Sequence, residues 1–157
     1  MKRKIFLILL VLAVAIQVVP YGRNHTNPAV VAQPKWDALR TKALFDRACA
    51  DCHSNQTHWP WYSHMAPVSW LVQRDVDGGR RHLNVDALGK SKRDHTKDAA
   101  NETREGEMPP WFYLPAHPDA RLSAAETAEL VAGLKATFGE KAGEKEGGEK
   151  EGEDDDD

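Results

Sequence analysis

Cys49, Cys52 and His53 form a C-x-x-C-H pentapeptide at residues 49–53. Two thiols at this spacing can add to the two vinyl groups of one haem, and the histidine that comes next can bind the iron beneath the ring. Few other patterns of five residues indicate one chemistry so specifically. We therefore expect one covalently attached haem c, with His53 as the proximal iron ligand.

Three other interpretations of the cysteine pair are a thioredoxin-type redox pair, half of a zinc site and a plain disulfide. A zinc site needs further Cys or His ligands at close spacing, but Cys49 and Cys52 are the only cysteines in the sequence. A thioredoxin-like motif is expected after a hydrophobic strand in a βαβ context, which the sequence around residue 49 lacks. Covalent haem is the favoured interpretation.

Met108 is the best candidate for the second axial ligand. It stands in the run Gly106-Glu107-Met108-Pro109-Pro110, where the prolines stiffen the loop that presents the thioether. A thioether is a soft, neutral donor that raises the reduction potential of haem iron. The alternatives are a vacant sixth position or one of five histidines: His58, His64, His82, His95 and His117.

Aromatic residues follow the haem motif and also follow Met108. We expect these residues to wall the pocket, and we expect their indole N–H and phenol O–H groups to donate to haem propionates. The cluster consists of Trp59, Trp61, Tyr62, Trp70, Trp111, Phe112 and Tyr113. Three arginines are weaker candidates for the propionates and are expected mainly to be solvated: Arg74, Arg80 and Arg81.

The N-terminus has the composition of a targeting segment. Three basic residues precede an apolar run from Ile5 to Val19, which Pro20 closes. As a helix this run reaches only about 22 Å, which is short for a hydrocarbon core of about 30 Å. We expect residues 1–21 to be a transmembrane anchor or a signal segment, with the anchor favoured, and either form exports the domain attached to it.

The C-terminal residues 139–157 contain ten acidic side chains and three lysines, without an aromatic or β-branched residue. Such a stretch cannot bury a core, so we expect a disordered acidic tail, either solubilising or steering a basic partner. The whole chain of 157 residues has a net charge of −3, so the rest of it carries +4.

Between a linker at 22–35 and this tail, residues 36–138 are expected to form one all-α domain. Apolar periodicity predicts helices over 36–50 and 67–81, with Gly78 and Gly79 ending the second. A polar helix is expected from about residue 94, closed by Gly106. Ser123 and Glu126 make a capping box before a last helix that ends near Phe138, in which Gly133 either admits another backbone or is merely tolerated.

The chain resembles the bacterial haem-binding domain family of monohaem, cytochrome c-like proteins. The resemblance is carried by residues 49–55, 59–62 and 66–71, and by Gly106-Glu107-Met108-Pro109-Pro110, Tyr113, His117-Pro118 and Leu122-Ser123. It covers about residues 36–138 and departs at 85–88, where the family pattern has a Phe-Ser-x-Trp-like segment. It implies a small, exported, mostly helical domain wrapped around one covalent haem. Cys49, Cys52 and His53 would be its attachment residues and Met108 its presumed axial ligand.

Two functions are compatible with these features. The first, which we favour, is an exported c-type cytochrome that carries electrons between redox proteins at the periplasmic face of the bacterial inner membrane. The second is a haem-based gas sensor or ligand-binding module with an exchangeable sixth position. We expect no enzymatic activity, since a His/Met iron has no free coordination site for bond-making chemistry. We also expect no nucleic-acid partner.

Overall fold

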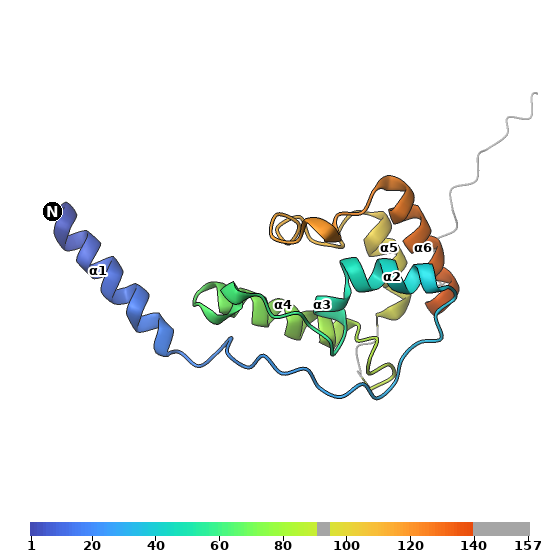
Figure 1. The fold of residues 1–157 in the computed structure, drawn as a ribbon, viewed down its shortest axis with the longest axis horizontal. Coiled ribbons are helices and arrows are strands. Elements are labelled where there is room, and N and C mark those ends of the chain that lie inside the picture. The colour runs from blue at the N-terminus through green and yellow to red at the C-terminus, as the bar shows by residue number, and fades with distance from the viewer. Residues whose placement is uncertain (91–94, 140–157) are drawn as a thin grey trace, which may run out of the picture.

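The computed structural model describes residues 1–90 and 95–139, and its regular elements are helical (Figure 1). The α-helices are α1 (Lys2–Ala15), α2 (Leu39–Ala48), α3 (Ala50–His53), α4 (Val68–His82), α5 (Ala99–Arg104) and α6 (Ala124–Phe138). Single 3-10 turns are η1 (Ile16–Val18), η2 (Trp61–His64), η3 (Thr96–Asp98) and η4 (Pro118–Ala120). Within the described residues, β-pairing is limited to one isolated bridge between Ala32 and Ala87. The all-α prediction is confirmed.

The hydrophobic core lies where α2, α5 and α6 meet. Leu44 and Phe45 of α2 pack with Leu130 and Leu134 of α6, and each of these four side chains is almost completely buried. The Trp36 ring lies 5.1 Å from that of Phe45, so the residues before α2 close one side of the core. The helix predicted over 36–50 is present but shorter than expected, since α2 begins at Leu39 and ends at Ala48.

Helices α2 and α6 cross at Gly133. A Cβ atom at this position would overlap the side chain of Thr41 on α2, so only glycine allows the helices to come this close. The close-approach interpretation of Gly133 is confirmed. The predicted capping box is also present, because the Ser123 hydroxyl accepts the Glu126 N–H and the Glu126 carboxylate accepts the Ser123 N–H.

Helix α4 continues through the glycine pair that was expected to end it. Gly78 and Gly79 lie inside the helix, which runs to His82. The prediction of a glycine stop was wrong because Gly79 serves a packing contact with α3. The polar helix before Gly106 is present as η3 and α5, and Gly106 has the positive φ of 78° that a C-terminal cap requires.

The segment 22–35, expected as a linker, lies along the domain and is held there by hydrogen bonds. The backbone N–H groups of Val31 and Ala32 donate to the Asp86 carbonyl at 2.9 and 3.0 Å. Farther back, the Asn27 amide donates to the Thr57 carbonyl, and the Ala29 carbonyl accepts from the Asn55 amide. This segment therefore contributes to the fold rather than only joining two parts of it.

The apolar N-terminal run forms α1, whose side chains are exposed throughout, and η1 follows directly. Gln17 connects η1 to the domain, because its side-chain amide donates to the Ala66 carbonyl and its carbonyl accepts the Ala66 N–H. Across the described residues, no helix combines the length and the apolar character needed to cross a membrane. Apart from Gly139, the predicted acidic tail lies outside the described residues.

Candidate functional site

A cavity of about 1190 Å³ lies between α4 and the segment from Met108 to His117, bordered also by α2, α3 and α5. Figure 1 shows this segment, in orange, running beside α4, with α2 and α3 next to both. The cavity is larger than the ~300–1,000 Å³ typical of small-molecule pockets. Five of the predicted site residues line it together: Cys49, Cys52, His53, Met108 and Tyr113.

The two cysteines lie on either side of a helix boundary. Cys49 separates α2 from α3 with φ −126° and ψ −31°, whereas Cys52 lies inside the single turn of α3. Both are free thiols. Burial, followed by the nearby acidic groups, raises the pKa of each thiol to about 12, so both are protonated at neutral pH.

The imidazole of His53 is oriented by the chain that follows α4. Its Nδ1 lies 3.0 Å from the carbonyl oxygen of Leu83. A carbonyl oxygen only accepts, so Nδ1 carries the proton and donates it, which leaves the Nε2 lone pair available to a metal. Burial lowers the pKa of His53 and outweighs its backbone hydrogen bonds, favouring the neutral ring that metal ligation needs.

Helix α4 lies directly against α3 because of Gly79. A Cβ atom on Gly79 would overlap the backbone carbonyl of Cys52. The guanidinium of Arg80 follows on the same side and donates to the Ser54 carbonyl at 2.9 Å, and also to Thr26, Asn27 and Thr57. The close packing of α4 on α3 and the hydrogen bonds of Arg80 thus hold the C-x-x-C-H segment, residues 49–53, against α4.

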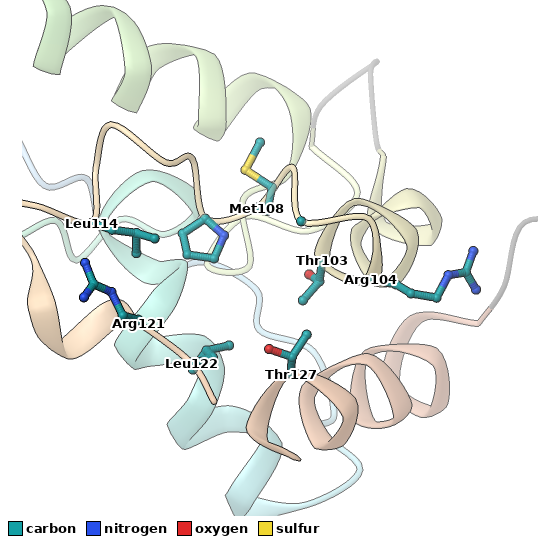
Figure 2. Close-up of a pocket in the computed structure, with 9 residues that line it drawn as sticks. Thr103, Arg104, Met108, Leu114, Arg121, Leu122 and Thr127 are labelled. Carbon is teal, nitrogen blue, oxygen red and sulfur yellow. The ribbon is translucent and has the colours of Figure 1, made fainter. Parts of the chain in front are cut away.

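Met108 lies between two cavities. Besides the large one, it borders a smaller pocket of about 220 Å³ that also includes Thr103, Leu122 and Thr127. Figure 2 shows the Met108 thioether directed away from Leu122 and Thr127. The Met108 N–H donates to the Glu102 carbonyl at 3.2 Å, which fixes the start of its loop to α5.

The structure distinguishes the histidines that compete with Met108. His64 does not line the large cavity and packs edge-on against His25, with ring centroids 4.4 Å apart. His117 does line it, but its Nδ1 faces the Tyr113 carbonyl at 3.0 Å and its Nε2 faces the Tyr62 hydroxyl at 3.1 Å. The other three line it from exposed positions: His58, His82 and His95.

The structure brings only part of the predicted aromatic cluster to the cavity. Tyr62, Phe112 and Tyr113 line it, but Trp59, Trp61, Trp70 and Trp111 do not. The Trp59 indole donates to Asn27, Trp61 is 75% exposed, and Trp70 lies on the face of α4 opposite the cavity-lining Val72 and Val76. They were predicted to line the pocket from their positions in the sequence, whereas the direction of each side chain depends on the local backbone and on the groups packed against it.

The three candidate arginines differ in whether they line the cavity. Arg80 does not line the cavity, and its guanidinium donates to backbone and side-chain acceptors, so it is a structural residue. Arg74 and Arg81 line the cavity, and Arg74 pairs with Asp75 at 3.0 Å.

Asp86, a buried carboxylate that accepts hydrogen bonds from residues just after the C-x-x-C-H segment, was not identified from the sequence. Its carboxylate accepts from Gln33 at 2.6 Å, from the Asn55 N–H at 2.9 Å and from Gln56 at 3.0 Å, and it is 0% exposed. Burial alone raises the pKa of Asp86, but these donors outweigh it and lower the pKa. The one sequence feature that drew attention to this region was the departure from the family pattern at residues 85–88.

A model of the haem-binding domain family matches residues 11–136, which include every residue of the site. The chain belongs to the haem-binding domain family. No curated protein and no solved structure matches the chain.

The residues that line the large cavity fit the group that this family binds, and we therefore refer to this cavity as the haem pocket. Two thiols, an imidazole with its Nε2 left free and a thioether line one cavity. Helix α4 adds four apolar side chains to the lining, those of Val68, Leu71, Val72 and Val76. This donor set suits covalent attachment through Cys49 and Cys52 and iron ligation by His53 and Met108.

Proposed function

We propose that the protein is an exported monohaem c-type cytochrome that transfers electrons and catalyses no reaction of its own. The observation that carries this proposal is the meeting of Cys49, Cys52, His53 and Met108 on one cavity, although Met108 is 55 residues from His53 in the chain. Haem bound there would supply a one-electron iron couple. A His/Met pair would leave the iron without an open position, which suits outer-sphere transfer.

The protein's own contribution would be ligand choice, orientation and exclusion of water. The Leu83 carbonyl sets the His53 tautomer, and hydrogen bonding from a ligating histidine to a carbonyl is the usual way in which proteins tune a metal. Apolar side chains of α4, among them Val72 and Val76, would cover one side of the ring and keep the iron site dry.

The proposed location is the periplasmic face of the bacterial inner membrane, with the N-terminal segment as anchor or cleaved signal. The support is the basic cluster at residues 2–4 before the apolar run, and the compartment in which C-x-x-C-H motifs receive haem. The proposed partners are a donor and an acceptor redox protein. Fractionation of cells, with the N-terminal sequence of the mature chain, tests the location.

The function is tested on full-length protein made in cells competent for cytochrome maturation. We expect a mass increase of one haem, a reversible one-electron couple, a thioether-to-iron band in the near infrared, and only slow, weak CO binding to the reduced protein. The variant Cys49→Ser with Cys52→Ser should lose the covalent mass increase. Fast CO binding to the unmodified reduced protein would instead support the sensor alternative, and absence of the mass increase would overturn both.

A further inference from the structure

The loop that carries Met108 is joined to the other wall of the haem pocket by two side-chain hydrogen bonds. The Tyr113 hydroxyl donates to the Asp51 carboxylate at 2.7 Å, and the Tyr62 hydroxyl lies 3.1 Å from His117 Nε2. Asp51 belongs to the haem motif and Tyr62 to η2, whereas Tyr113 and His117 belong to the Met108 loop, residues 107–117. The contacts therefore span the cavity rather than stiffening one side of it.

The donor and acceptor of each bond follow from the neighbouring groups. His117 Nδ1 lies 3.0 Å from the Tyr113 carbonyl oxygen, which only accepts, so Nδ1 holds the proton in the neutral ring. His117 Nε2 is then an acceptor, and the Tyr62 hydroxyl donates to it. Burial, and then the bond to Asp51, raises the pKa of Tyr113, so its phenol remains a donor at every physiological pH.

Asp51 is itself held in place. Its second carboxylate oxygen accepts the His58 backbone N–H at 2.8 Å, and its carbonyl accepts the Thr57 hydroxyl at 2.6 Å. The carboxylate that receives Tyr113 therefore cannot follow the loop if the loop moves. A hydrogen bond to a charged acceptor is also stronger than one between neutral groups.

Tyr113 and His117 pack together as one unit. Their rings are stacked with centroids 3.7 Å apart and an interplanar angle of 9°, in addition to the bond between His117 Nδ1 and the Tyr113 carbonyl. The Tyr113 N–H donates to the Pro110 carbonyl at 3.0 Å, and Pro109 and Pro110 stiffen the chain between Met108 and Tyr113. Fixing Tyr113 therefore also fixes the position of Met108.

We propose that Asp51, Tyr62, Tyr113 and His117 form a clasp that closes the Met108 loop over the haem pocket, and that Asp51 and Tyr113 are positioning residues for the sixth iron ligand. This rests on the proposed His53/Met108 ligation. Met108 is held from one end by the Glu102 carbonyl on α5 and from the other by Asp51, through Tyr113. With the clasp open, the smaller pocket beside Met108 offers the side chain a place away from the iron.

The decisive variant is Tyr113→Phe in the haem-loaded protein, because it removes the hydroxyl and keeps the ring that stacks on His117. We expect a weaker thioether-to-iron band and an apparent CO affinity of the reduced protein that rises about 10- to 100-fold, the range set by one lost charge-assisted hydrogen bond. Tyr62→Phe should have the same direction and a smaller effect. Tyr21→Phe, a tyrosine outside the cavity lining, is the matched control and should change neither readout.

A second readout does not depend on the iron. Backbone amide exchange should accelerate in residues 107–117 of Tyr113→Phe and stay unchanged in α2 and α6, which shows that the domain remains folded. In Asp51→Asn, adding Tyr113→Phe should change CO binding by less than it does in the unmodified protein, because the two residues act through one bond.

The outcomes separate the clasp from the proposed function. Unmodified protein without a thioether band overturns the His53/Met108 ligation, and the clasp with it. Unmodified protein with the band, together with a Tyr113→Phe variant that has the same band, CO affinity and loop exchange, overturns the clasp alone.

Discussion

His53 and Leu83 are joined by a hydrogen bond of 3.0 Å between the imidazole Nδ1 and the backbone carbonyl oxygen. The connection runs in both directions, because the Val85 N–H donates to the His53 carbonyl at 2.9 Å. His53, the proposed proximal ligand, is thus held by its ring and by its backbone to one short segment after α4. A main-chain acceptor cannot be removed by a substitution at Leu83, so the tautomer of His53 depends on the fold rather than on the identity of a neighbouring side chain.

Replacing the proposed sixth ligand should open the iron. In haem-loaded Met108→Ala we expect loss of the thioether band, a lower reduction potential and CO affinity of the reduced protein higher by on the order of tenfold or more. Met65→Ala is the control, since Met65 is exposed and does not line the cavity. Visible spectra and CO titration measure both. Equal CO affinity in Met108→Ala and the unmodified protein would exclude Met108 as the ligand.

Replacing each of the two glycines of α4 by alanine should have a different effect on the free energy of unfolding. Gly79→Ala places a methyl group on the Cys52 carbonyl and should lower the free energy of unfolding by about 1–3 kcal/mol, with poorer haem attachment. Gly78→Ala meets only Arg81, at 3.9 Å, and should be neutral or stabilise by up to about 1 kcal/mol through helix propensity. Denaturant unfolding and haem content per chain decide between them. Similar losses in both variants would show that packing on α3 is not the cause.

The buried carboxylate of Asp86 should be among the most sensitive positions outside the pocket. Asp86→Ala leaves donors of Gln33, Gln56 and Asn55 without their acceptor, and we expect a loss of about 2–4 kcal/mol in unfolding free energy. Asp119→Ala, at an exposed carboxylate, is the control and should stay within about 0.5 kcal/mol. Urea unfolding followed by circular dichroism gives both values. A loss below about 1 kcal/mol in Asp86→Ala would contradict the role of this centre.

Glu126 should contribute to acid sensitivity. Its hydrogen bond from the Ser123 N–H, and then its pairing with Arg47, lower the pKa of Glu126 from 4.5 to about 2. The stabilisation is present above pH 4.5 and disappears as the pH falls from there to about 2, where the folded-state carboxylate takes up its proton. Glu126→Gln should therefore flatten the fall in thermal midpoint across this window. Glu129→Gln, which removes a partner of Arg40 without touching the cap, should keep the fall. Superimposable pH profiles for Glu126→Gln and the unmodified protein would refute the assignment.

Features that depend on neighbours along the chain could be predicted from sequence. The capping box at Ser123 and Glu126 needs only a spacing of three residues, and the last helix follows from its apolar periodicity. Gly106 ends α5 as expected for the same reason. The glycines of α4 were misinterpreted because a glycine that ends a helix and one that admits another backbone look identical until the partner, here Cys52, is known.

The sequence by itself determined the chemistry that we propose for the site, since two thiols and an imidazole within five residues need no distant partner to be recognised. Only the tertiary structure decided which groups face them. The Leu83 carbonyl lies 30 residues from His53, and the Tyr113 hydroxyl lies 62 residues from Asp51. Hydrogen bonds depend on distances of about 3 Å and on direction, and no spacing in a linear chain fixes these over such separations. The same limit explains why Tyr113 lines the haem pocket while three nearby tryptophans do not.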